Sequence, residues 1–258
     1  SWTVIVAPEP EVSKAYTHYV MNLMVEIAQS LEMFADAKEY QMIADGTKIA
    51  YQELVKTEKF TLDTDRQAKL VRPLYFNLLE NDQKEFAKNR LIKALDNFDW
   101  KLGTGFLSTP LIMYVLESIN IEYAYKLIEN EQMPGWLFMP KNGATTIWES
   151  WEGTSAHSGI ASLNHYSKGA VIDWLFSEMC GIKVTGENKF ILDPKPGGTF
   201  TFARASYQSI YGLINSEWKK DKDKTIYDFV VPSNCTAEIN LQGEISQVVS
   251  AGHHRFEL

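Results

Sequence analysis

The sequence predicts a mainly helical chain that ends in a small β domain. Up to about residue 182, apolar and aromatic residues recur at intervals of three and four, as on one face of a helix. After Gly181, alternating residues rich in β-branched side chains are separated by turns that contain glycine and proline. We therefore expect a helical domain over residues 1–182 and a small β-sandwich over residues 183–258.

The first part divides into helices after an extended start in which two prolines prevent a helix. Pro73 should kink or split the third helix, whereas Thr109 and Pro110 should be the N-cap and first residue of the fifth. Short loops join the segments, which is typical of stacked antiparallel hairpins. The expected helices are Glu11–Leu31, Asp36–Leu54, Thr64–Leu79, Asn81–Asn97, Thr109–Ser118, Ile121–Gln132 and Asn164–Cys180.

The second part shows the period-two alternation of strands. A short run from Phe190 precedes the turn Pro194–Gly198, and further strands follow it. They are expected at Thr199–Tyr207, Gly212–Lys219, Thr225–Val231, Thr236–Leu241 and His253–Leu258.

Composition excludes several classes of partner. The formal net charge is −8, and the run from Lys219 to Lys224 alternates in sign like a solvated turn, so we expect neither nucleic acid nor membrane as a partner. No apolar run is long enough to span a bilayer and no signal-peptide pattern opens the chain, so we expect a soluble protein and leave the compartment open. The start at Ser1 suggests a processed or excised piece.

Metal and cofactor motifs are lacking from the sequence. There is no H-E-x-x-H, no C-x-x-C and no acidic calcium loop, so we expect no metal and no cofactor. Cys180 and Cys235 lie far apart and are expected to be free thiols. His18 is expected on a helix surface, and His253 is expected in solvent.

The stretch Asn142–Gly153 carries the chemistry that stands out most. It places Glu149 between Trp148 and Trp151, and sugar chemistry uses both carboxyl groups and aromatic rings. The alternative is half-buried core with solvated acids. Glu152 precedes the turn signal Gly153 and is interpreted as a loop carboxylate, because it also lies too near Glu149 to complete an inverting pair.

Six motifs, taken in order, resemble the C-terminal part of an α-L-rhamnosidase of glycoside hydrolase family 78. The resemblance implies an (α/α)6 barrel followed by a β-sandwich, and hydrolysis that releases terminal L-rhamnose from glycosides or polysaccharides. The motifs are T-G-F-L-S-T-P from Thr104, N-G-A-T-T-I-W-E-S-W from Asn142, S-L-N-H-Y-S-K-G from Ser162, P-K-P-G-G from Pro194, A-S-Y-Q-S-I-Y-G from Ala205 with S-E-W from Ser216, and V-P-S-N-C-T-A from Val231.

The resemblance also implies roles for particular residues. Glu149 matches the general base of an inverting reaction, in which two carboxyl groups stand roughly 6.5–9.5 Å apart. His165 matches a histidine near the sugar subsite, and one of Trp148 and Trp151 is expected to face the sugar. Trp2 falls near the position of a sugar-stacking tryptophan in a G-D-W motif, although Ser1 replaces the aspartate.

The family's general acid lies in a D-x-x-x-R-E segment, which this sequence lacks. The chain also has fewer helices than six hairpins require. We therefore expect a fragment without the acid and the first barrel helices, with open flanks through which it self-associates. Two alternatives remain: another six-hairpin-barrel hydrolase or lyase, and a sugar-binding or structural fragment without turnover.

Overall fold

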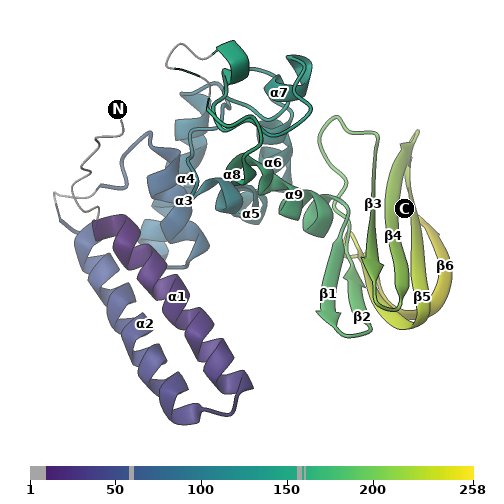
Figure 1. Ribbon diagram of the computed structural model, residues 1–258, viewed down its shortest axis with the longest axis horizontal. Helices are drawn as coiled ribbons and strands as arrows, with labels where there is room; N and C mark the ends of the chain where they lie inside the picture. Colours follow the sequence, from purple (N-terminus) through teal and green to yellow (C-terminus); the bar gives the residue numbers. More distant parts are fainter. Residues whose placement is uncertain (1–9, 58–60, 156–158, 160) are drawn as a thin grey trace. The chain divides into compact units, whose positions relative to one another are not determined.

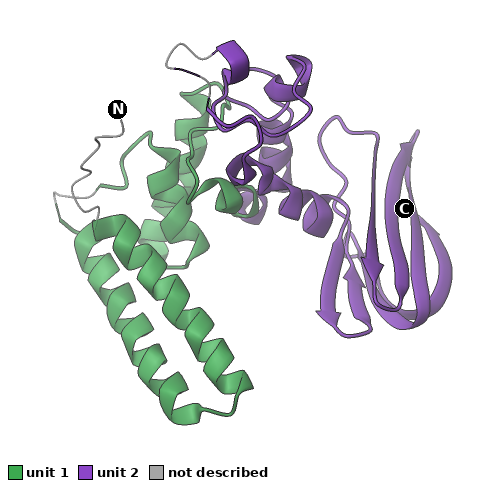
Figure 2. Cartoon of the chain, viewed as in Figure 1, with its two compact units in different colours: residues 1–115 green, residues 116–258 purple. Residues whose placement is uncertain are grey.

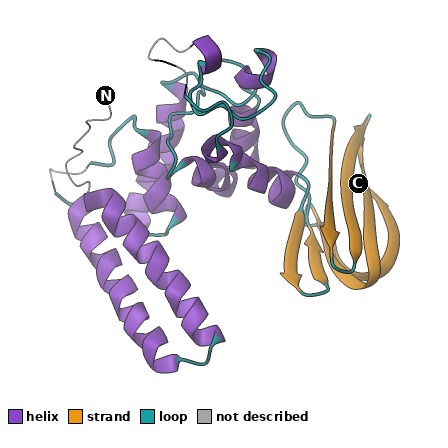
Figure 3. Cartoon of the chain, viewed as in Figure 1, coloured by secondary structure: helices purple, strands orange, loops and turns teal. Residues whose placement is uncertain are grey.

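The computed structural model describes residues 10–57, 61–155, 159 and 161–258. The chain divides into two compact units, residues 1–115 and 116–258, and helix α5 contains the boundary (Figure 2). Helices make up the first unit and the first part of the second, and strands follow (Figure 3). Trp2 lies outside the described residues.

The helices agree with most of the predicted segments. Pro73 lies inside α3 without ending it, and the last predicted helix is divided into two short α-helices and a π-helical turn, Leu175–Met179. The short helix α7 and the 3-10 turn Gly153–Ser155 were not predicted. The α-helices in Figure 1 are α1 Pro10–Ser30, α2 Phe34–Val55, α3 Gln67–Tyr75, α4 Asn81–Asp96, α5 Thr109–Ile119, α6 Ile121–Ile128, α7 Phe138–Lys141, α8 Tyr166–Gly169 and α9 Val171–Trp174.

The N-cap predicted for α5 is wrong by one residue. Thr109 already lies in the helix, and the carbonyl of Ser108 accepts from the N–H groups of Leu111 and Ile112. The Thr109 hydroxyl instead donates to the Gly105 carbonyl, four residues back. A threonine hydroxyl can satisfy a backbone group in either way, so sequence alone does not fix the first residue of the helix.

In the first unit, α1 and α2 form a hairpin whose buried residues are mostly small. Alanines at positions 15, 28, 37 and 44 are at most 6% exposed. The prediction that His18 lies on the helix surface is wrong: His18 is 9% exposed, and its Nδ1 lies 2.9 Å from the Ala44 carbonyl oxygen. Small side chains permit close approach of the two helices, and the imidazole then reaches the backbone of α2.

Several large apolar residues of this hairpin are nevertheless exposed to solvent. Leu23 is 37% exposed, Ile27 51% and Met42 61%. The three-and-four periodicity therefore predicted the helices correctly, but several of their larger residues stay exposed, whereas Tyr51 is fully buried. The other exposed large apolar residues of this hairpin and its turn are Tyr19, Val20, Leu31, Met33, Phe34, Ile43 and Ile49.

A buried ion pair joins α1 to α3. The guanidinium of Arg72 donates twice to the Glu11 carboxylate, at 2.9 and 2.5 Å, and the two side chains are 8% and 2% exposed. Tyr51 from α2 donates to the same carboxylate, and Arg72 also donates to the Ser108 hydroxyl. Burial, followed by the adjacent Glu11, raises the pKa of Tyr51, which keeps its hydroxyl protonated.

In the second unit, the strands form one six-stranded sheet that bends at a bulge in β5. The first half of β5 pairs with β4, and the second half pairs in parallel with β2. Strand β6 pairs with both halves, and the register shifts between Val231 and Thr236. The bounds are β1 Ile182–Gly186, β2 Lys189–Leu192, β3 Phe202–Ser209, β4 Gly212–Asp221, β5 Lys224–Leu241 and β6 Ile245–Glu257.

Side chains from the sheet complete the end of the π-helical turn. The indole N–H of Trp218 donates to the Met179 carbonyl at 2.7 Å, and the Ser216 hydroxyl donates to the Cys180 carbonyl at 2.5 Å. Both donors are fully buried on β4. Helix-terminal carbonyls need such partners away from water, which accounts for the serine and tryptophan of the S-E-W motif. Cys180 and Cys235 are free, as predicted, and both are buried.

The turn Pro194–Gly198 lies on helix α6. Tyr125 donates to the Lys195 carbonyl, and a Cβ atom at Gly197 would overlap the Tyr125 ring. Gly198 has a φ of +54°, a conformation that side chains rarely adopt. The two glycines therefore permit close contact between the turn and α6.

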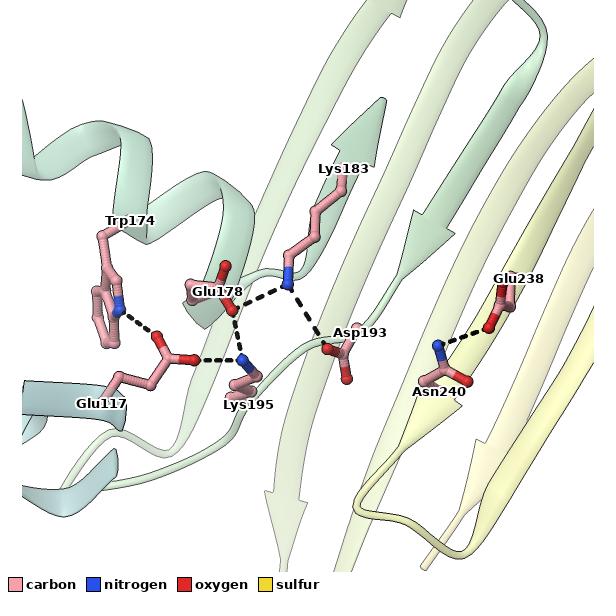
Figure 4. A network of polar contacts seen from close by, with 8 residues as sticks. All are labelled: Glu117, Trp174, Glu178, Lys183, Asp193, Lys195, Glu238 and Asn240. Atoms are coloured by element: carbon pink, nitrogen blue, oxygen red, sulfur yellow. Dashed lines mark hydrogen bonds and ion pairs between the residues drawn. The ribbon is translucent and has the colours of Figure 1, made fainter. Parts of the chain in front are cut away.

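Lys195 from the same turn enters a network of buried charges (Figure 4). Its ammonium contacts the carboxylates of Glu117 and Glu178, the latter at 2.5 Å. The indole of Trp174 donates to Glu117 at 2.7 Å, and Lys183 bonds to Glu178 at 3.0 Å. Burial and the adjacent Glu178 raise the pKa of Glu117, although its bonds to Lys195 and Trp174 oppose the shift.

Replacing Lys195 by Met is expected to destabilise the chain by about 1–2 kcal/mol, less than a fully buried pair because the lysine is 31% exposed. The bond from Lys195 lowers the pKa of Glu117, so its removal should raise that pKa further. A carboxyl whose folded pKa is raised contributes stability below its unfolded pKa, near 4.3, and loses it as pH rises through the folded value. The destabilisation by Lys195→Met should therefore grow with pH. Urea unfolding of both proteins at several pH values measures this dependence.

The matched control is Lys224→Met, because Lys224 pairs with Glu257 at the surface and is 66% exposed. Its unfolding midpoint should match that of the unmodified chain across the same pH range. A Lys195→Met deficit that does not change with pH would contradict the interpretation of the network.

No helix in the described part of the chain is both long and apolar enough to cross a membrane.

Candidate functional site

Two segments of the second unit lie side by side and carry the predicted site residues. The N–H of Glu149 donates to the Ser162 carbonyl at 2.8 Å, and the N–H of His165 donates to the Ile147 carbonyl at 2.8 Å. Thr146 adds a side-chain bond to the Leu163 carbonyl. These contacts align the W-E-S-W segment with the L-N-H-Y segment and bring Glu149 and His165 onto adjacent stretches of backbone.

The carboxylate of Glu149 is held at one oxygen. Its Oε2 accepts from the N–H of Ser162 at 3.0 Å, so the residue is bonded to Ser162 through both backbone and side chain. The residue is partly exposed. One fixed oxygen and partial exposure suit a carboxylate that takes a proton from water.

His165 is held by the helix that follows it. Its Nδ1 accepts from the N–H of Ser167 at 3.2 Å, which makes it the N-cap of α8, and its ring stacks on Tyr166 with centroids 5.1 Å apart. A neutral imidazole that accepts at Nδ1 carries its hydrogen on Nε2. The cap therefore fixes both the tautomer and the direction of the ring.

The two tryptophans of the motif have different surroundings. Trp148 is 8% exposed and packs on Gly153, where a Cβ atom would overlap the ring and φ is +54°. Trp151 is only partly buried, and the ammonium of Lys168 lies 4.3 Å from its ring centroid. Trp151 is thus the more exposed of the two tryptophans.

Other predicted groups are not brought into this arrangement. Glu152 is exposed beside the Gly153 turn. His253 lies on β6, where its Nε2 is 2.6 Å from Asp228. Within the described residues, no group of three histidine, cysteine or acidic side chains could hold a metal ion.

Sequence reasoning missed two participants, Ser162 and Lys168. Both belong to the S-L-N-H-Y-S-K-G motif, so the signal was present in the sequence. Lys168 is 8% exposed and donates to the carbonyls of Trp148 and Glu149. Because lysine is rarely buried without a carboxylate partner, nothing in its residue type indicated this position.

Two larger surface hollows of the described chain contain none of the predicted site residues. One of about 640 Å³ is lined by Val55, Leu62 and Phe86 among others, and one of about 680 Å³ by Arg204, Glu217 and Asp228 among others. The assignment of the site therefore depends on its motif and backbone pairing, and not on cavity size.

The helical part of the chain falls into the class of six-hairpin glycosidase domains. Residues 7–179 match the model of the bacterial alpha-L-rhamnosidase 6 hairpin glycosidase domain, and residues 184–256 match that of the bacterial alpha-L-rhamnosidase C-terminal domain. The chain belongs to the bacterial alpha-L-rhamnosidase family.

Curated relatives share the name alpha-L-rhamnosidase. The one from Formosa agariphila is 31% identical over 95% of this chain and 27% of its own length, and the one from Streptomyces avermitilis is 28% identical over 96% and 25%. The chain thus spans about a quarter of the length of the relatives it matches.

Solved structures agree with the fold. The native enzyme from Aspergillus terreus superposes with a TM-score of 0.88 at 26% identity, over 98% of this chain and 31% of that one. The Streptomyces avermitilis enzyme, solved in complex with L-rhamnose, gives 0.86 at 27% identity over 100% of this chain and 28% of its own.

Proposed function

We propose that this chain is the base-bearing part of an inverting α-L-rhamnosidase that releases terminal L-rhamnose from glycosides or polysaccharides. The observation that carries the proposal is the pairing of Ile147–Glu149 with Ser162–His165 in a chain of this family. In the same proposal the helices belong to an (α/α)6 barrel, and residues 183–258 form its C-terminal β-sandwich.

In this mechanism, Glu149 removes a proton from a water molecule as the water oxygen bonds to the anomeric carbon. The bond from that carbon to the leaving oxygen breaks, and the leaving oxygen takes a proton from a general acid on the opposite face. We place that acid outside this chain, because the D-x-x-x-R-E pattern is lacking here. The water oxygen ends on the sugar with inverted configuration.

The remaining residues would bind the sugar. His165 would donate from Nε2 to a sugar hydroxyl, and the Trp151 ring would pack on sugar C–H groups. Trp148 is only 8% exposed and would have a packing role instead.

The test uses the full-length protein that contains this chain, with a panel of aryl glycosides and calorimetric titration with L-rhamnose. Hydrolysis of the aryl α-L-rhamnoside with release of the inverted sugar, read by NMR, is expected. Turnover of a different glycoside would favour another six-hairpin glycosidase, and rhamnose binding without turnover would favour a binding fragment.

His165→Ala in the full-length protein is expected to raise KM for the aryl rhamnoside by about 10-fold, the loss of one hydrogen bond of about 1–1.5 kcal/mol. Steady-state kinetics measures this. His165→Asn, which can still accept from the Ser167 N–H, separates the cap from the sugar contact. A lowered melting midpoint with unchanged kinetics would show that His165 is structural.

Self-association is part of the same proposal. When the chain is isolated, a second copy should cover the exposed apolar residues of α1 and α2. Among these, Ile27 is 51% and Met42 61% exposed. Sedimentation should give a mass above one chain, and Ile27→Glu with Met42→Glu should restore the mass of one. A single-chain mass at high concentration would contradict this.

A further inference from the structure

We infer that Lys168 is a positioning residue for the proposed reaction: it tethers the backbone of the W-E-S-W segment so that the Glu149 carboxylate faces the attacking water. The inference rests on the proposed function. The Lys168 ammonium bonds to backbone carbonyls of the segment that holds Glu149, so it acts through Glu149.

The tether consists of three contacts from one ammonium group. Lys168 Nζ donates to the carbonyl oxygens of Glu149 and Trp148, the latter at 3.4 Å, and lies 4.3 Å from the centroid of the Trp151 ring. Two successive carbonyls held by one group fix the peptide planes on both sides of the Glu149 Cα. The direction of the Glu149 Cα–Cβ bond is thereby fixed as well, and the Ser162 N–H holds the carboxylate at its end.

The position of Lys168 is itself held from the other side. The indole N–H of Trp136 donates to the Lys168 carbonyl at 2.8 Å, and Trp136 is 6% exposed. Lys168 also belongs to α8, whose N-cap is His165. Lys168 therefore connects the buried Trp136 to the backbone of the proposed base, Glu149.

Burial of the Lys168 ammonium costs desolvation free energy, which an apolar side chain at this position would not cost. Burial lowers the pKa of Lys168, while the charges of Glu149 and Glu152 raise it in part. An apolar residue would fill the same volume without desolvating a charge, but it could not donate to two carbonyls. The two carbonyls and the indole ring that the ammonium contacts all belong to the segment that carries Glu149.

The experiment compares Lys168→Met and Lys168→Arg in the full-length protein. Met keeps the length and removes the donors, so kcat for the aryl rhamnoside should fall about 10–100-fold with KM within about two-fold, as for a small misplacement of a reacting group. Arg can donate to both carbonyls and lie on the indole ring, so it should recover most of kcat. Unchanged kcat in Lys168→Met would overturn the inference.

A second variant covers the case in which Lys168→Met does not fold. Trp136→Phe keeps the packing but removes the bond to the Lys168 carbonyl, and it should lower kcat by a smaller factor with unchanged KM. A fall in melting midpoint with normal kcat in this variant would show a structural role only.

Failure of the inference is distinguishable from failure of the proposed function. If the unmodified protein hydrolyses no rhamnoside, the function fails, and the tether is then tested by hydrogen exchange. Lys168→Met should speed exchange in residues 145–153 and leave strand β4 unchanged, because the Glu149 N–H would lose a fixed alignment with Ser162. Equal exchange in residues 145–153 would overturn the tether itself.

Discussion

Glu149→Gln in the full-length protein is expected to lower turnover of an aryl rhamnoside by about 10²–10⁴-fold, the usual contribution of a positioned acid or base. Glutamine keeps the shape of the side chain and its oxygen still accepts from the Ser162 N–H. Only the ability to take a proton from water is lost, so the affinity for L-rhamnose should change little. Single-turnover kinetics and calorimetry measure the two quantities separately.

The matched control is Glu152→Gln, the same substitution three positions further along. Glu152 is exposed in the turn at Gly153, so its turnover should stay within about two-fold of the unmodified protein, as for a surface change. Near-normal turnover in Glu149→Gln would refute the assignment of the base. A large loss in Glu152→Gln would move the assignment to that residue.

Arg72→Met is expected to destabilise the chain by about 3–5 kcal/mol, because it leaves the Glu11 carboxylate buried and without its cation. Glu11 is 2% exposed and would keep only its bond from Tyr51 among the contacts described above. Urea unfolding followed by far-ultraviolet circular dichroism, which reports on the helices, measures the loss. The double variant Glu11→Met with Arg72→Met should recover much of it, since no buried charge then remains.

Arg90→Met serves as the control for Arg72→Met. Arg90 also bonds to two carboxylate groups, but Asp63 and Asp65 are 73% and 60% exposed. Ion pairs with exposed partners contribute about 0–1 kcal/mol, so the midpoint should move little. Equal losses in the two variants would show that burial of the Glu11–Arg72 pair does not matter.

The helices were predictable because their period is a local property, but their packing was not. The spacing of Leu23, Ile27 and Leu31 predicted α1, yet the residues that α1 buries include Ala15, Ala28 and His18. A helical period indicates that a face is apolar without indicating what covers it. The same limit explains His18, whose burial depends on the distant Ala44 carbonyl.

The strands show a related limit. Two expected strands, one ending at Val231 and one beginning at Thr236, are a single strand β5 with a bulge between them. In the sequence, Pro232 suggests a break between two strands. In the structure, Asn234 has a positive φ, yet β6 pairs with β5 on both sides of this segment. Whether a proline ends a strand depends on its partners, which are distant in sequence.

At the candidate site, sequence indicated Glu149 and His165 through the resemblance of their motifs. It did not indicate that the two motifs pair through their backbones, because that contact joins residues 147–149 to 162–165. Lys168 was overlooked for the same reason: its donors meet the carbonyls of Trp148 and Glu149, some twenty residues earlier in the chain.

One backbone bond and one bond to the Glu149 carboxylate join Glu149 to Ser162, at the two ends of the segment 150–161. Lengthening a loop costs little entropy once its ends are fixed, since each doubling adds only about 0.6 kcal/mol. Changes of length beyond Gly153 are therefore expected to leave the proposed base in place. Segments of different length can be grafted between Glu149 and Ser162 while the contacts between these two residues are kept.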